Sequence, residues 1–146
     1  MNIREMCLDD LEQVCILEQE MFSSPWSQKS FADAIANPSN IYLVAEEEKD
    51  ILGYCGMWGI AGEGQITNVA VKKTCRKKGI GKQMLELLLQ KGEKNGIVAF
   101  TLEVRESNHA AIALYEKFNF INAGVRKNYY EKPTENAVIM WKNQER

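Results

Sequence analysis

The chain has 146 residues, of which 45% are hydrophobic and 26% are charged, and its formal net charge is −2. These values are typical of a globular protein with a substantial core, so we expect a single domain over residues 1–146 and no direct binding of nucleic acid. No apolar run approaches the roughly 20 residues of a membrane-spanning helix, and the N-terminus does not resemble a signal peptide. The four cysteines lack metal-finger spacing and the chain has one histidine, so we expect free thiols, no metal and a cytoplasmic location.

The first half of the chain changes from helical to extended patterns. A short strand is predicted over Asn2–Met6, and Asp9-Asp10 then open a helix. Ser27 caps a second helix, which ends before Pro38. Three strands follow, over Ile41–Glu46, Ile51–Ile60 and Gln65–Val71. The turns that join them are short enough for antiparallel hairpins, and we place them at Glu48-Lys49-Asp50 and Gly62-Glu63-Gly64.

The second half contains the longest predicted helix, from Gly79 to about Lys94. Its predicted buried side carries Ile80, Met84, Leu87, Leu88 and Lys91. Further elements are a strand over Ile97–Val104, a helix capped by Ser107 or Asn108 that runs through Phe118, and two strands over Phe120–Lys127 and Asn136–Trp141. The order β-α-α-β-β-β-α-β-α-β-β predicts an α/β fold with an α+β-type mixed sheet. That sheet is antiparallel in its hairpins and parallel where the long helix crosses over.

The most informative stretch is Lys72–Lys82, in which six of eleven residues are Lys or Arg and none is acidic. It joins a strand to a helix and contains Gly79 and Gly81. Glycines and the free N–H groups of a helix N-terminus allow a phosphate to approach the backbone closely. The nucleotide motifs do not fit, because Met84 replaces the last Gly or Ala of the dinucleotide fingerprint and Gln83 replaces the Ser or Thr of the P-loop. The alternatives are therefore another anion site or a solvated basic loop.

Three polar residues near the following strand and helix are candidates for chemistry. Glu103 lies either on the wetter face of a strand or at the crevice beyond its carboxyl end, where partial burial would raise its pKa toward that of a general base. Tyr115 is either a core residue or a proton donor in the same crevice. Asn108 is a helix cap or a ligand contact. We assign no role to His109.

Charge is distributed unevenly along the chain. Residues 1–50 hold eleven acidic and three basic residues, whereas residues 72–94 hold eight basic and two acidic residues. The acidic half either steers a basic partner toward the protein or is a solvated helix face.

Taken together, these residues resemble one family over nearly the whole chain. Arg76-x-x-Gly79-x-Gly81 after a strand is similar to the acetyl-CoA pyrophosphate signature of the Gcn5-related N-acetyltransferase (GNAT) superfamily. The segment Leu102–Tyr115, with Pro25-Trp26 and Tyr129-Tyr130, resembles its ribosomal-protein-alanine N-acetyltransferase branch.

The resemblance implies a splayed central sheet and an acetyl-CoA-dependent enzyme that acetylates the N-terminal alanine of a small-subunit ribosomal protein. We expect a monomer. It implies Glu103 as the proton acceptor, directly or through water, and Tyr115 as the proton donor to the departing thiolate. Implied substrate contacts are Pro25, Trp26, Tyr129 and Tyr130. Implied cofactor contacts are Val69, Ala70, Val71, Arg76, Lys77, Lys78, Gly79, Ile80, Gly81, Lys82 and Asn108.

Two positions depart from the family pattern. Asn119 stands where the family has Gly, and Asn is the next most tolerant residue in a left-handed turn. Glu135-Asn136 stands where an acidic pair is expected, which leaves the peptide substrate less well defined. The alternative functions are acetylation of lysine side chains or small amines, and a CoA-binding sensor or scaffold without catalysis. The presence of both Glu103 and Tyr115 argues against the second.

Overall fold

The computed structural model describes residues 1–143, which form one mixed sheet with helices on both faces. The strands are β1 (Asn2–Glu5), β2 (Ile41–Glu47), β3 (Asp50–Ile60), β4 (Glu63–Val71), β5 (Ala99–Arg105), β6 (Ile121–Tyr130) and β7 (Glu135–Asn143). The α-helices are α1 (Leu11–Met21), α2 (Gln28–Ala36), α3 (Ile80–Lys94) and α4 (His109–Lys117), and short 3-10 turns cover Leu8–Asp10 and Lys73–Cys75.

The spatial order of the strands is β1-β2-β3-β4-β5-β7-β6. Every neighbouring pair is antiparallel except β4 and β5, which are parallel and are joined through α3. The mixed α/β fold, the element order and the single crossover predicted from the sequence are therefore confirmed. None of the helices within residues 1–143 is both long enough and apolar enough to cross a membrane.

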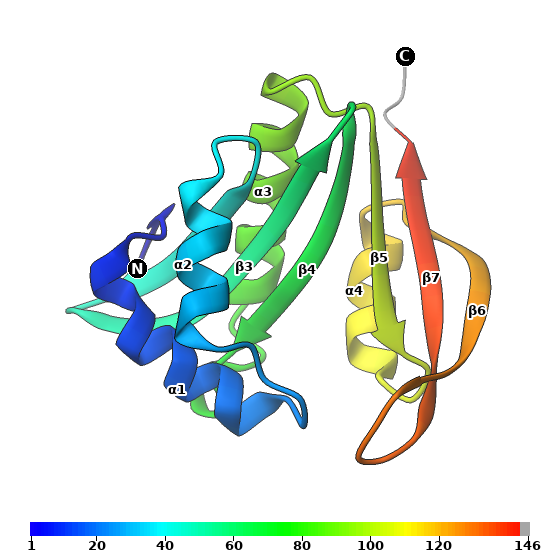
Figure 1. Cartoon of the computed structure of the whole chain (residues 1–146), viewed down its shortest axis with the longest axis horizontal. Helices are drawn as coiled ribbons and strands as arrows, with labels where there is room; N and C mark the ends of the chain where they lie inside the picture. Colours follow the sequence, from blue (N-terminus) through cyan, green and yellow to red (C-terminus); the bar gives the residue numbers. More distant parts are fainter. Residues whose placement is uncertain (144–146) are drawn as a thin grey trace.

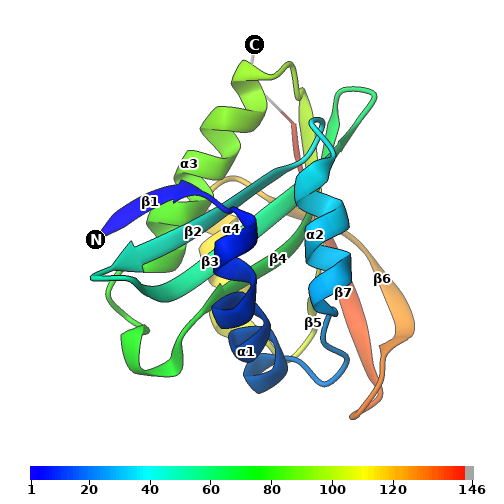
Figure 2. The same cartoon turned by 60° about the vertical axis from the view of Figure 1, so that its left-hand side comes forward.

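The sheet separates two hydrophobic cores. Helices α1 and α2 cover one face, and α3 and α4 cover the other (Figures 1 and 2). The α1–α2 core contains Leu11, Val14 and Phe31, whereas the α3–α4 core contains Met84 and Leu88. Successive side chains of a strand point to opposite faces of the sheet. A residue that packs in one core therefore has adjacent residues in the same strand that point to the opposite face.

Several local predictions are confirmed by hydrogen bonds and backbone angles. The Ser27 hydroxyl accepts a hydrogen bond from the Ser30 N–H at the start of α2. Asn108, and not Ser107, caps α4, because its side-chain oxygen accepts from the Ala111 N–H. Asn119 has a φ of 70°, so the residue that departs from the family pattern does adopt the left-handed turn.

Other predictions were wrong in detail. Both hairpin turns contain two residues, Glu48-Lys49 and Ala61-Gly62, all at positive φ. Two-residue turns with positive φ match the twist of the flanking strands. The sequence did not indicate them, because three of the four residues are types that rarely adopt positive φ. The buried face of α3 is rotated from the predicted one, so that Leu85, Leu89 and Gly92 are buried while Leu87 and Lys91 are only half-buried. Val98 precedes β5 and is exposed, and β6 extends to Tyr130.

Candidate active site

The central feature of the sheet is a separation between its two parallel strands. The last paired residues are Ile66 in β4 and Leu102 in β5, although β4 continues to Val71 and β5 to Arg105. Figure 1 shows the two strands diverging beyond this point. The predicted splayed sheet is therefore present, and its opening lies at the carboxyl ends of β4 and β5, where α/β sheets bind ligands.

The edge of β4 that borders the opening presents free backbone groups. The Lys72 N–H donates to the Leu52 carbonyl of β3 at 2.8 Å, and Ala70 pairs with Tyr54 in the same strand. Since successive residues of a strand direct their N–H and C=O groups to opposite edges, those of Val69 and Val71 face the opening. Ala70, the third predicted cofactor residue of this strand, instead turns its backbone to β3 and its buried side chain to the α1–α2 core.

The basic loop after β4 forms the start of α3. Gly79 has a φ of 79° and precedes the first helical residue, and the first hydrogen bond of the helix joins the Gln83 N–H to the Gly79 carbonyl. The N–H groups of Ile80, Gly81 and Lys82 thus have no acceptor within the helix, as is usual for a first turn. The Lys and Arg side chains of residues 76–82 are exposed, whereas the Ile80 side chain is buried and leaves only its backbone available.

Gly81 faces the remaining two elements of the opening. A Cβ atom built at Gly81 would lie 3.6 Å from Cγ2 of Val71 and 3.7 Å from Cδ2 of Leu114, which is ordinary contact distance. The start of α3, the end of β4 and helix α4 therefore meet at one place. Asn108, at the N-terminus of α4, is exposed, and its side-chain oxygen accepts the hydrogen bond that caps the helix. This place combines free backbone N–H groups, positive charge and a glycine that lets a ligand approach the backbone. Such a combination suits a phosphate group.

Glu103 occupies the α1–α2 side of the opening. Its neighbours Leu102 and Val104 belong to the α3–α4 core, so alternation along β5 turns the carboxylate to the opposite face. The side chain is 15% exposed, and its Oε2 atom forms an ion pair with Nε of Arg126 at 3.6 Å, which is too long for a hydrogen bond. Its Oε2 atom is buried and has no hydrogen-bond partner among the described residues. An acceptor left in this condition is available to a donor from a ligand.

Tyr115 approaches the opening from the other face. It is buried in the α3–α4 core, and its ring packs edge-on against Phe120 with centroids 5.8 Å apart. Burial raises the pKa of Tyr115, so the hydroxyl keeps its proton at neutral pH. The sequence predicted that Tyr115 and Glu103 share one crevice. In the structure they belong to opposite faces of the sheet, and only the separation of β4 from β5 connects them.

The predicted substrate residues lie on the same face as Glu103. The Trp26 ring packs against Phe31 and Trp58, with centroids 5.1 and 5.9 Å away, while Pro25 is exposed. At the end of β6, Tyr129 is 48% exposed. Its pKa is raised, mainly by the partial burial of the phenol and then by the negative charge of the nearby Glu103 carboxylate. Tyr130 is half-buried, and burial raises its pKa to about 12.

Arg105 links the loop that carries Trp26 to the turn that follows Tyr130, and sequence reasoning assigned it no role. Its guanidinium donates to the Ser23 hydroxyl before α2 at 3.2 Å and to the Glu131 carbonyl after β6 at 3.0 Å. It also forms an ion pair with Glu135 at 3.2 Å. Hydrogen bonds from Ser107 and then from this guanidinium hold the pKa of the Glu135 carboxyl below its usual value. Glu135 thus holds the Arg105 guanidinium in place. The guanidinium in turn joins the loop before α2 to the turn after β6.

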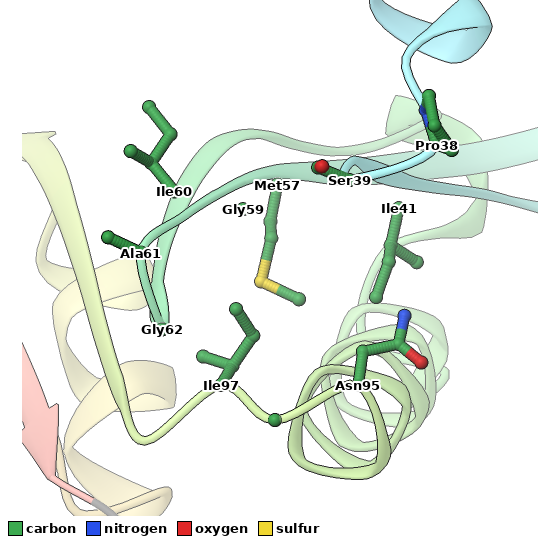
Figure 3. A pocket seen from close by; sticks show the side chains of 11 residues that line it. Pro38, Ser39, Ile41, Met57, Gly59, Ile60, Ala61, Gly62, Asn95 and Ile97 are labelled. Carbon is green, nitrogen blue, oxygen red and sulfur yellow. The ribbon is translucent and has the colours of Figure 1, made fainter.

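Two cavities are lined by other sets of residues. The first, shown in Figure 3, is bounded by the β3–β4 turn and the end of α3, and none of its lining residues can ionise. It lies at the far end of α3 from the basic loop and lacks groups for proton transfer. The second borders Trp26 and Trp58 on the α2 side and includes the Asp33 carboxylate. Within residues 1–143, no three His, Cys, Asp or Glu side chains gather as a metal site would require.

Comparison with known proteins agrees with this geometry. The model of the acetyltransferase (GNAT) family matches residues 11–120. The [ribosomal protein bS18]-alanine N-acetyltransferase of Escherichia coli K12 is 36% identical over 137 residues, which are 90% of this chain and 89% of that protein. A Bacillus subtilis protein that carries the same name provisionally is 39% identical over 140 residues, 95% of this chain and 93% of that protein.

A solved structure of the ribosomal-protein-S18-alanine N-acetyltransferase from Escherichia coli superposes with a TM-score of 0.91 and 31% identity. The superposition covers 99% of this chain and 94% of that one. The family predicted from the basic loop and the Leu102–Tyr115 segment is thereby confirmed. The chain belongs to the acetyltransferase (GNAT) family.

Proposed function

We propose that this protein is an acetyl-CoA-dependent N-terminal acetyltransferase that modifies the N-terminal alanine of ribosomal protein bS18 or a similar small-subunit protein. The observation that carries the proposal is the opening between β4 and β5, with a basic helix start on one side and Glu103 with exposed aromatic residues on the other. The names of the similar Escherichia coli and Bacillus subtilis proteins supply the substrate. We expect the enzyme to act in the cytoplasm, as a monomer.

The proposed roles follow from where the groups lie. The free N–H groups at the start of α3 and the side chains of Arg76, Lys77, Lys78 and Lys82 would hold the pyrophosphate of acetyl-CoA. The edge of β4 at Val69 and Val71 would pair with its pantetheine arm, which delivers the thioester to the opening. Asn108 would touch the cofactor from the N-terminus of α4.

On the opposite face, Pro25, Trp26, Tyr129 and Tyr130 would hold the peptide, with its amine at Glu103. Glu103 would take the proton that makes the amine cationic, directly or through water, and release it to solvent. As the neutral amine forms the C–N bond and the C–S bond breaks, Tyr115 would give its proton to the sulfur, and the nitrogen would lose its second proton to Glu103. A strand N–H near Val69 stabilises the charge that develops on the carbonyl oxygen.

The reaction favours an α-amine over a lysine side chain. An α-amino group has a pKa of roughly 7.7–8.0, whereas that of lysine is about 10.4, and only the neutral form attacks a thioester. Deprotonating lysine at pH 7 therefore costs about 3.4 kcal/mol more. A single carboxylate is therefore sufficient to deprotonate an α-amine, whereas a lysine side chain would react more slowly.

The substrate assignment is tested with two matched peptides. The first begins Ala-Arg with a free α-amine and contains no lysine, and the second has the same sequence blocked at the α-amine and bearing one lysine. We expect kcat/KM at pH 7 to be about 300-fold higher for the first peptide, which reflects the difference in amine pKa. A preference for the lysine peptide would instead support a lysine or small-amine acetyltransferase, and binding of CoA without turnover would indicate a sensor or scaffold.

Acetylation in cells provides a second test of the substrate. Mass spectrometry of ribosomal proteins from cells with and without this gene should show one small-subunit protein that loses its N-terminal acetyl group. An unchanged set of ribosomal N-termini would leave the chemistry intact and reject the proposed substrate.

The proposed phosphate site predicts an unusual response to Gly81→Ala. The added methyl group meets only ordinary protein contacts, and alanine raises helix propensity, so the free energy of unfolding should stay the same or rise by up to about 1 kcal/mol. The same methyl group would occupy the space proposed for the pyrophosphate, so we expect the KM for acetyl-CoA to rise about 10-fold or more. Gln90→Ala, on an exposed position of α3, is the matched control. An unchanged KM would exclude this part of the backbone from the cofactor site.

A further inference from the structure

A buried polar cluster lies on the α1–α2 face of the sheet, next to the opening. The Glu18 carboxylate is 2% exposed and accepts from the Tyr54 hydroxyl at 2.5 Å, from the Trp26 N–H at 2.9 Å and from Nδ2 of Asn68 at 3.4 Å. Asn68 lies in β4 and is 5% exposed. The cluster joins α1, the loop before α2, β3 and β4, and no pattern in the sequence indicates it because its members are 8 to 50 residues apart.

The contacts of Glu18 fix the direction of the Asn68 side chain. Two carboxylate oxygens that receive three donors are acceptors only, so Asn68 must present its NH₂ group to them. Its carbonyl oxygen, Oδ1, then faces away from Glu18. Oδ1 is buried and has no hydrogen-bond partner within residues 1–143. Buried polar atoms of this kind are rare and call for an explanation.

In the part of the chain that the structure describes, two buried side-chain oxygens lack a hydrogen-bond partner, Oδ1 of Asn68 and Oε2 of Glu103. The second also forms an ion pair with Arg126 at 3.6 Å. Both oxygens flank the same opening. Asn68 lies two positions beyond Ile66 on β4, and Glu103 lies one position beyond Leu102 on β5, where Ile66 and Leu102 are the last paired residues. Both side chains are on the α1–α2 face, because Asn68 contacts α1 and Glu103 is opposite to the α3–α4 core. Two acceptors that lack a hydrogen bond, one on each strand, suit a ligand that carries several N–H donors at one atom.

We propose that Oδ1 of Asn68 binds the attacking amine of the substrate, opposite Glu103, and that Glu18 holds the Asn68 amide in the orientation this requires. This inference rests on the proposed acetyltransferase function. A primary ammonium group has three N–H bonds, and Glu103 takes one proton. Asn68 then accepts one of the two remaining N–H bonds of the neutral amine, which aims the nitrogen lone pair at the thioester carbon.

The chemical type of the acceptor fits this task. An amide oxygen accepts a hydrogen bond without competing for the proton, whereas a second carboxylate would favour the unreactive ammonium form. One carboxylate and one amide thus remove a single proton and retain the neutral amine in place. Asn68 is by this account a catalytic residue that touches the substrate, and Glu18 is a positioning residue.

The experiment compares Asn68→Leu, the double variant Glu18→Gln with Asn68→Asp, and Thr67→Val. Leucine has nearly the shape of asparagine without its acceptor, so kcat/KM for the amine substrate should fall about 10²-fold while the KM for acetyl-CoA stays within twofold. Thr67→Val alters the neighbouring residue, whose hydroxyl bonds Tyr42, and should stay within about twofold of the unmodified protein.

The double variant exchanges the amide and the carboxylate between positions 18 and 68. The new amide at position 18 donates to the new carboxylate at position 68, so the hydrogen bond is reversed and an oxygen again faces the opening. Because a second carboxylate favours the ammonium form, activity is compared at pH 9, where an α-amine with a pKa of roughly 8 is mostly neutral. At this pH the double variant should recover most of the loss.

Each assay uses whichever amine the unmodified protein acetylates, so the two proposals can fail separately. Turnover of lysine peptides alone would reject the substrate proposal and still test Asn68. Thermal denaturation of every variant shows whether it folds.

If Asn68→Leu does not fold, the double variant provides the test. Activity of the double variant at pH 9 near that of the unmodified protein supports the proposal. A loss of about 10²-fold in a folded double variant overturns it. A folded Asn68→Leu protein with unchanged kcat/KM also overturns it, and absence of turnover with any amine rejects both proposals.

Discussion

Glu103→Gln is expected to reduce kcat/KM for an N-terminal alanine peptide by about 10²-fold or more, the usual contribution of a general base. Glutamine keeps the shape of the side chain but cannot take the proton of the amine. The residual rate should therefore rise steeply with pH up to about 8 to 9, as the amine loses its proton to solvent. Steady-state assays from about pH 6 to about pH 9.5, which bracket the α-amine pKa, measure both effects.

A matched control separates the role of Glu103 from a general loss of negative charge. Glu106 lies just after β5, its side chain is exposed, and Glu106→Gln removes the same charge from the same region. We expect that variant to stay within about twofold of the unmodified enzyme. Equal activity of the two variants would show that Glu103 is not the proton acceptor.

Tyr115→Phe is expected to reduce kcat by about 10²-fold or more, because the departing thiolate would lose its proton donor. The folded state should not suffer, since phenylalanine keeps the ring that packs against Phe120. A kinetic defect without a fall in thermal stability distinguishes a role in chemistry from a role in packing. Tyr42→Phe, which removes a buried hydroxyl bonded to Thr67, provides the comparison.

The pH dependence of the unmodified enzyme carries further information on Tyr115. Burial raises the pKa of this phenol above its ordinary value of 10.0. Because the proposed role requires the protonated form, the rate should not decline near pH 10 through loss of this proton. A decline there that disappears in Tyr115→Phe would show that the phenol is more exposed to solvent than the structure indicates.

Glu103 and Tyr115 lie on opposite faces of the sheet, which suits the proposed meeting of two substrates at the opening. The thioester would enter from the face of α3 and α4, and the amine from the face of α1 and α2. Direct transfer requires no enzyme nucleophile. Cys55 belongs to the same core as Tyr115, but it is fully buried and burial raises the pKa of its thiol, so it is a poor nucleophile.

Short-range chemistry explains which features could be read from the sequence. Ser27 and Asn108 are caps because a side-chain oxygen satisfies a helix N–H three residues away, and this depends on local spacing alone. Asn119 is tolerated in its turn for an equally local reason. The basic loop with its glycines and the Glu103–Tyr115 segment likewise lie within short stretches. They were sufficient to predict the fold, the family and the residues proposed for chemistry.

What the tertiary structure decided involves contacts between distant residues. The separation of β4 and β5 beyond Ile66, the opposite faces of Glu103 and Tyr115, and the free oxygen of Asn68 are properties of pairing and packing. Arg105 contacts a hydroxyl 82 residues away, at Ser23. No periodicity or motif marks such pairs, because the energy that selects them arises only when the elements that carry them have been brought together and water has been excluded.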